Sequence, residues 1–150
     1  MARSRWVLLA YRLPREPSTP RIAVWRRLRR LGALQLGDGL VALPENPRTR
    51  EALEWVAEEV EQAGGDAMVW LAEPAASTDE RALEARMADA AAADYRAVVE
   101  ATRAAACREP AARRRSAARL RRTLQQVRAR DFFPPPERSE AEHAVEELAS

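Results

Sequence analysis

The chain has 150 residues, a length that suits one compact domain or a small domain with a helical appendage. Alanine supplies much of the 47% hydrophobic content, aromatic residues make up 5% and there are five glycines, which favours helices and excludes an all-β fold. One cysteine and one histidine exclude an internal disulfide and a zinc cage, and no apolar run is long enough to span a membrane. We therefore expect a cytoplasmic protein without a membrane partner.

The charges are unevenly distributed along the chain, although the formal net charge is only +2. All 25 basic residues are arginines. Residues 1–50 carry a net charge of +8, residues 51–100 of −10 and residues 101–150 of +4; the stretch 103–130 has ten arginines and one acid, Glu109. Such clustering of one sign on separate segments predicts an anionic partner.

The first half of the chain predicts alternating strands and helices. A short apolar run over residues 6–11 reads as a buried strand, and Thr19-Pro20 reads as the N-cap and first residue of a helix. Gly37-Asp38-Gly39 predicts the turn of a hairpin, Asn46-Pro47 the start of a second helix, and residues 67–71 a fourth strand. The order βαββαβ predicts an α+β fold, a ferredoxin-like sandwich over residues 1–74.

Apolar residues at helical spacing predict which side of each helix packs on the sheet. In the first helix we expect Ile22, Trp25, Leu28 and Leu31 to pack, with Gly32 as a left-handed C-cap. In the second helix the expected buried residues are Leu53, Val56, Ala57, Val60 and Ala63. Trp6, Trp25 and Trp70 fall on predicted core positions; Trp55 lies off the apolar stripe and covers either the sheet edge or a contact with the later helices.

The second half of the chain predicts helices alone. A capping box at Ser77 opens a long helix toward Cys107, and Pro110 opens another. In that second helix Ala117, Leu120, Leu124 and Val127 have the spacing of a helical-hairpin seam. We therefore expect a hairpin over residues 75–131. A proline segment and a short helix capped at Ser139 fill residues 132–150.

Residues for catalysis are scarce in this sequence. It has no glycine-rich phosphate loop and no nucleophile elbow, so we expect a protein that is not an enzyme and has no cofactor and no bound metal. Cys107 lies near Arg103 and Arg108, which could make it a redox-sensitive thiol, but a small residue in the helix seam is the favoured interpretation.

The clustered arginines predict a nucleic-acid-binding surface, because each arginine that neutralises a phosphate releases condensed counterions. The predicted contacts are Arg12, Arg15, Arg21, Arg26, Arg27, Arg30, Arg113, Arg114, Arg115, Arg119, Arg121 and Arg122. In the opposing interpretation, Glu51, Glu54 or Glu58 of the acidic second helix neutralises the first basic block inside the fold.

Two other functions remain open for these segments. Arg12, Arg15 and Arg21 near the start of the first helix could bind a small oxyanion such as sulfate. Alternatively, the hairpin over residues 77–130 could pair with a second chain, as a dimerisation or scaffold element.

The sequence also resembles a known family. The LPREPSTPR loop, the WRRLRRLGA helix end and the RDFFPPP segment resemble the N-terminal domain family of the chromate-resistance regulator ChrB. The front half is similar to the ferredoxin-like domain of the phenylacetate-degradation repressor and to CRISPR-associated integration subunits. Nuclease members of that wider group end the first strand with an aspartate, whereas Arg12 follows Tyr11 here, so no nuclease site carries over.

The resemblance implies a transcriptional regulator of a chromate-efflux operon that binds promoter DNA. It also makes chromate, a dianion like sulfate, the oxyanion to consider at Arg12, Arg15 and Arg21. Full-length members carry a further C-terminal domain to which chromate sensing is attributed, and this sequence ends at Ser150 without it. The resemblance therefore leaves a homodimer and a separate chromate-sensing subunit as partners to consider beside the promoter.

Overall fold

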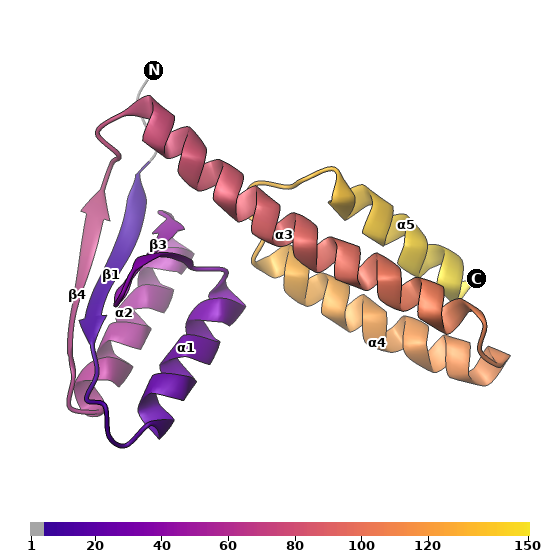
Figure 1. The fold of residues 1–150 in the computed structure, drawn as a ribbon, viewed down its shortest axis with the longest axis horizontal. Helices are drawn as coiled ribbons and strands as arrows, with labels where there is room; N and C mark the ends of the chain where they lie inside the picture. The colour runs from indigo at the N-terminus through magenta and orange to yellow at the C-terminus, as the bar shows by residue number, and fades with distance from the viewer. Residues whose placement is uncertain (1–4) are drawn as a thin grey trace. The chain divides into compact units, whose positions relative to one another are not determined.

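The computed structural model of the chain, shown in Figure 1, describes residues 5–150, so the first four residues of the expected 1–74 domain lie outside it. The described residues form a mixed α+β structure with a four-stranded antiparallel sheet and five helices. The chain divides into two compact units, Met1–Leu83 and Glu84–Ser150. The expected boundaries at residues 74 and 131 stay predictions.

The first unit is built on the antiparallel sheet. The strand order is β2-β3-β1-β4, which places the central strand β1 between β3 and β4. The predicted hairpin turn is present: Gly39 has φ 68°, and a side chain there would collide with the carbonyl of Tyr11. The strands are β1 (Trp6–Arg12), β2 (Leu34–Gly37), β3 (Leu40–Pro44) and β4 (Asp66–Ala72).

Two helices, α1 (Thr19–Leu31) and α2 (Pro47–Gln62), complete the first unit. The Asn46 side chain accepts a hydrogen bond from the Thr49 amide at 2.9 Å and the Thr49 hydroxyl accepts one from the Asn46 amide at 3.0 Å, so the predicted start of α2 is confirmed by a reciprocal cap. Strand and helix side chains form the core, and those that are fully buried include Val7, Leu9, Leu43, Leu53, Val56 and Val60.

The predicted packing stripe of α1 is wrong in part. Ile22 is 46% exposed and Trp25 is 51% exposed, whereas Leu28 is buried together with Val24, which the sequence analysis did not include. On a helix of 3.6 residues per turn, residues spaced by three are each rotated by about 60° from the one before. The first and last of the four predicted residues therefore face opposite sides of the helix. The buried pair Val24 and Leu28 has the four-residue spacing that stays on one face. The helix also begins one residue earlier than expected, with Ser18 at the N-cap, and Gly32 is left-handed at φ 80° as predicted.

Two of the three predicted core tryptophans are exposed. Trp6 is buried as expected, but Trp70 is 53% exposed like Trp25. Trp70 pairs with Leu8 in the sheet register, on the face opposite the fully buried Val7 and Leu9. β4 is an edge strand of the described sheet, so its side chains have a neighbouring strand on one side only. This leaves Trp70 less covered than a side chain of a central strand. Trp55 is also exposed, and its indole nitrogen donates a hydrogen bond to Glu51 of the same helix at 3.5 Å.

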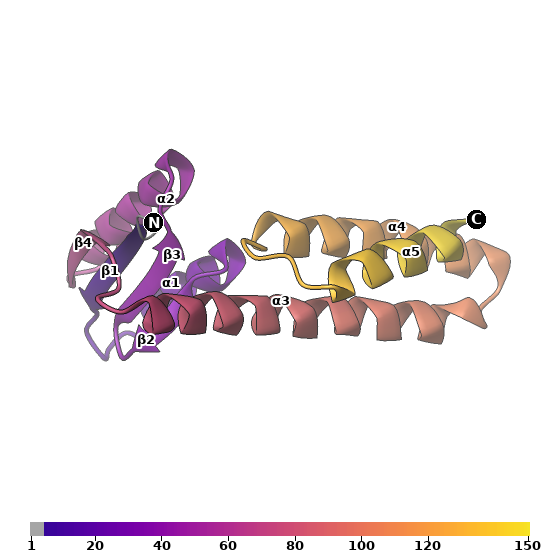
Figure 2. The ribbon, with the colours of Figure 1, turned by 90° about the horizontal axis from the view of Figure 1, so that it is seen from above.

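The second unit packs three helical segments around one core, in which the expected short C-terminal helix lies with the two helices of the expected hairpin. Figure 2 shows α4 and α5 running alongside the unit-2 part of α3. The predicted α4 seam is buried, but Ala141, Val145 and Leu148 of α5 share its cluster with Tyr95 and Val98 of α3. These helices are α3 (Ser77–Ala106), α4 (Pro110–Ala129) and α5 (Glu137–Ala149).

Two smaller expectations about this unit are also wrong. Helix α5 begins at Glu137 with Pro136 as its N-cap rather than at Ser139, because proline is well suited to a helix start. Cys107 is exposed just after the end of α3, so it is not a small residue in the helix seam.

Candidate nucleic-acid interface

The arginines of α4 lie around a helix whose buried face is fixed by the seam. Ala117, Leu120, Leu124 and Val127 are 2–7% exposed, so this face packs on the core of the second unit. At 100° per residue, Arg115 and Arg122 point almost directly away from that face. Arg119 adjoins them to form an i, i+4, i+7 row, and Arg114 and Arg121 lie beside it; all five are exposed, whereas Arg113 is half-buried.

None of these six α4 arginines has an acid within ion-pair distance among residues 5–150. By contrast, other arginines of the second unit have partners: Arg96 binds Glu137 at 2.9 Å and Arg130 binds Asp94 at 3.1 Å. Arg103 binds Glu100 at 2.9 Å. Several acids of the unit thus pair with other arginines, and the outward face of α4 keeps its positive charge.

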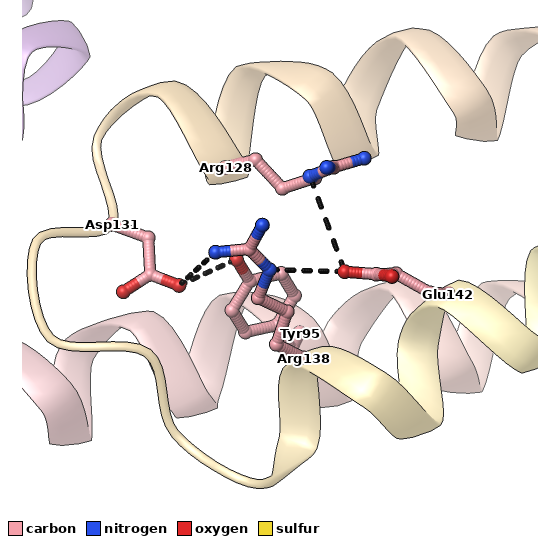
Figure 3. Close-up of polar contacts among 5 residues, drawn as sticks. All are labelled: Tyr95, Arg128, Asp131, Arg138 and Glu142. Atoms are coloured by element: carbon pink, nitrogen blue, oxygen red, sulfur yellow. Dashed lines mark hydrogen bonds and ion pairs between the residues drawn. The ribbon is translucent and has the colours of Figure 1, made fainter.

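A buried polar network fixes the C-terminal end of α4 against the other helices. Figure 3 shows Asp131, directly after the helix, with its carboxylate accepting a hydrogen bond from the Tyr95 hydroxyl at 2.7 Å. The Asp131 side chain is 1% exposed and lies 3.9 Å from a guanidinium nitrogen of Arg138. Arg138 in turn donates to Glu142 at 3.0 Å, and Glu142 lies 4.0 Å from Arg128 of α4. The network thus joins α3, the end of α4 and α5.

The surroundings of Tyr95 hold its hydroxyl in the protonated state. Burial raises the pKa of Tyr95 above its usual value of 10.0, and the hydrogen bond to Asp131 raises it further because only the protonated phenol can donate to the carboxylate. The nearby Arg138 lowers the pKa by a smaller amount. At neutral pH the Tyr95 hydroxyl is therefore a neutral donor to the Asp131 side chain. The sequence gives no signal for this network, because Tyr95 and Asp131 are 36 residues apart and neither belongs to a recognisable motif.

The basic block of α1 differs, since part of it is paired inside the fold. Arg27 contacts Glu59 of α2 at 3.2 Å, and the Arg29 guanidinium lies 5.1 Å from the centre of the Trp25 ring. The acid that neutralises part of this block inside the fold is therefore Glu59, and not Glu51, Glu54 or Glu58 as the sequence suggested. Arg26 and Arg30 are exposed and have no ion pair within the described part of the chain.

The structure brings Arg12, Arg15 and Arg21 together along one open groove of about 1310 Å³ in the first unit. Tyr11 and Trp25 also line it. Burial raises the pKa of Tyr11, and the positive charge of Arg21 partly offsets that rise. Two acids, Asp38 and Asp66, line the same groove, and Asp66 lies opposite Arg12 in the sheet register. The groove therefore has mixed charge, unlike the outward face of α4.

Neither a metal site nor a membrane helix is found in the part of the chain that the structure describes. Among residues 5–150, no three His, Cys, Asp or Glu side chains are placed to hold one metal ion. No described helix combines the length and apolar character needed to cross a bilayer.

The fold and its surfaces define a class of protein: an α+β domain followed by a three-helix unit with one arginine-covered helix. The family model described as "Protein ChrB, N-terminal" matches residues 21–150. The chain is also 33% identical to Protein ChrB of Cupriavidus metallidurans over 141 residues, which cover 91% of this chain and 43% of that protein. The chain belongs to the ChrB N-terminal domain family. It spans less than half the length of this relative, and no solved structure matches it.

Proposed function

We propose that the chain is a DNA-binding module in the transcriptional regulation of a chromate-resistance system. The observation that carries this proposal is the outward face of α4, where Arg114, Arg115, Arg119, Arg121 and Arg122 are exposed without an acid partner among the described residues. Membership of the ChrB N-terminal family supports the regulatory role. We also propose that the module is not an enzyme and works in the cytoplasm, where the promoter is.

The geometry of the α4 row suits a DNA backbone. A helix rises about 1.5 Å per residue, so Arg115 and Arg122 are about 10 Å apart along α4. A duplex carries one negative charge per roughly 1.7 Å of its axis, so the row can reach more than one phosphate. Guanidinium groups donate in a fork that fits two phosphate oxygens at once. Contacts of this kind set affinity and position but carry no base specificity.

The proposal also concerns the fold and the role of the first unit. The strand order β2-β3-β1-β4 with intervening helices is the order of a ferredoxin-like sandwich, and we propose that the unit is one. Arg26 and Arg30 of α1 could add phosphate contacts, but the paired Arg27 and the mixed charge of the nearby groove make this surface the weaker one. We further propose that chromate sensing resides in another domain or a separate subunit.

A DNA titration tests the proposal directly. Fluorescence anisotropy of a labelled promoter fragment from chromate-resistance genes, with a scrambled duplex of equal length as comparison, should show binding of both at low salt. Tighter binding of the promoter would indicate that residues outside the α4 row read its sequence or shape. Absence of binding to either duplex at about 50 mM salt, where counterion release favours phosphate contacts most, would reject the DNA-binding role.

The alternative function, binding of a small oxyanion, rests on the groove that holds Arg12, Arg15 and Arg21. Chromate and sulfate are dianions that guanidinium groups recognise well. Isothermal calorimetry with chromate and with sulfate should give heat for the wild type and none for an Arg15→Gln/Arg21→Gln variant if this alternative holds. No heat from either anion with the wild type removes it.

A further inference from the structure

The β4 edge strand points to an interface that none of the preceding functions uses. Three large apolar side chains of this strand are exposed: Met68 at 56%, Trp70 at 53% and Leu71 at 37%. Native edge strands are usually protected from pairing by a charge, a proline, a bulge or short length. The other edge, β2, is four residues long and irregular between Gln35 and Gly37. In contrast, β4 has seven residues and no charge or proline after Asp66.

The sheet register shows which backbone groups of β4 face away from the sheet. Tyr11 donates to the Gly39 carbonyl at 2.8 Å and Glu45 donates to the Arg5 carbonyl at 3.0 Å, so odd-numbered residues of this segment bond toward β3. Even-numbered residues of β1 therefore bond toward β4, and their register partners are the even-numbered residues of β4. The N–H and C=O groups of Ala67, Val69 and Leu71 consequently point outward, where no strand of residues 5–150 lies beside β4.

This free edge is complementary to itself. A second β4 strand related by a two-fold axis at Val69 would form a hydrogen-bonded pair there and pair Ala67 with Leu71 of the other copy. Met68 would lie opposite Trp70 of the other copy in the non-hydrogen-bonded positions, where side chains are closest. Thioether and aromatic groups attract each other in such contacts. The only charge of the strand, Asp66, would lie opposite Ala72, so no like charges meet.

We propose that the chain forms a homodimer by antiparallel pairing of β4 with β4 of a second copy, centred on Val69. The exposed parts of the three apolar side chains amount to roughly 300 Å² per copy. With the backbone strip added, the interface falls below the roughly 1,200 Å² of stable complexes, so the dimer belongs to the weak, reversible class. The pairing does not depend on the DNA-binding role.

Amide hydrogen exchange measured by NMR on the wild type tests the register residue by residue. Between about 10 and 300 µM protein, a range suited to weak association, the amides of Ala67, Val69 and Leu71 should become more protected. The amides of Met68 and Trp70 should be protected throughout because they bond to β1. Exchange at the three outward amides that is independent of concentration would overturn the proposal.

Sedimentation velocity over the same concentrations gives an independent test. The wild type should shift toward a dimer, and Val69→Pro should remain a monomer because proline removes an outward N–H while leaving the bonds of Met68 and Trp70 to β1. Trp70→Lys should also prevent association if Val69→Pro does not fold. The control Trp55→Lys changes an equally exposed tryptophan on α2 and should dimerise like the wild type. A wild type that stays monomeric, or a Val69→Pro dimer, would contradict the proposal.

Discussion

The two basic helices, α1 and α4, differ in what surrounds them more than in how many arginines they carry. Beside α1, Glu59 of α2 binds Arg27 and the Trp25 ring lies against Arg29, so part of the block is occupied within the fold. Around α4, Glu142 lies near Arg128 at the end of the helix, and other acids bind arginines such as Arg96 and Arg130. The outward-facing Arg115, Arg119 and Arg122 have no ion pair among residues 5–150. The comparison teaches that the position of acids in the fold decides which cluster is available to an outside anion.

The largest expected effect is loss of DNA affinity when the α4 row is neutralised. The Arg115→Gln/Arg122→Gln variant should bind the promoter fragment about 50-fold more weakly at 0.1 M salt, since two lost phosphate contacts remove nearly two powers of ten there. Anisotropy titration measures it. The control Arg96→Gln/Arg103→Gln has the same loss of charge at positions already paired with Glu137 and Glu100, and it should bind within about threefold of wild type. Equal losses in both variants would mean that total charge alone matters.

The second effect concerns the network that holds the end of α4. Tyr95→Phe should lower the free energy of unfolding by about 2 kcal/mol, because the buried Asp131 carboxylate loses its hydroxyl donor. Urea denaturation followed by circular dichroism measures the change. An exposed control, Gln125→Ala on α4, should change stability by less than about 0.5 kcal/mol. A Tyr95→Phe variant as stable as wild type would show that the network does not hold the unit together.

The same tyrosine predicts a pH dependence at the alkaline end. The pKa of Tyr95 is raised in the folded state above its unfolded value near 10.0, so its contribution to stability is complete below pH 10 and is lost as the pH rises beyond it. Urea midpoints between about pH 8 and pH 11 should fall more steeply for the wild type than for Tyr95→Phe. Parallel curves for the two proteins would contradict the assignment.

A smaller effect is expected from the corresponding pair of arginines on α1. Arg26→Gln/Arg30→Gln removes two charges from the block that lies beside the acidic helix α2, and the loss of affinity at 0.1 M salt should stay below about fivefold. The same anisotropy assay compares it with the α4 variant. A loss as large as that of Arg115→Gln/Arg122→Gln would erase the difference between the two helices.

The smallest expected effect tests why α1 and α4 differ in DNA affinity. Glu59→Gln frees Arg27 from its internal partner and should raise DNA affinity about twofold, while lowering the free energy of unfolding by less than 1 kcal/mol because the pair is partly exposed. Anisotropy and urea denaturation report the two changes. Unchanged affinity would indicate that α1 does not approach the DNA.

Local signals in the sequence predicted much of the fold. The Asn46 cap, the glycine turn at Gly39 and the α4 seam depend on neighbours in sequence, so their positions follow from short patterns. The burial of Trp25 and Trp70 could not be judged in this way, because it depends on helix rotation and on β4 being the terminal strand. The place of α5 in the core was also missed, since its apolar stripe of Ala141, Val145 and Leu148 does not show which other helices it packs on.

The sequence predicted which arginines form the candidate site, but not which of them are paired with acids in the fold. The arginine clusters are visible in the sequence, and the structure brings Arg12, Arg15 and Arg21 to one groove. Which acids neutralise which arginines depends on tertiary contacts such as Arg27 with Glu59 and Arg130 with Asp94. The Tyr95–Asp131 hydrogen bond depends on the same kind of contact between distant segments.

The salt dependence of promoter binding tests the role of α4 most directly, because its slope counts the phosphates that are neutralised. With about six phosphates engaged, a plot of log affinity against log salt concentration should have a slope near −5 for the wild type. The Arg115→Gln/Arg122→Gln variant should give a slope near −3, since each lost contact removes about 0.9. An unchanged slope in that variant would contradict the account, whatever its absolute affinity.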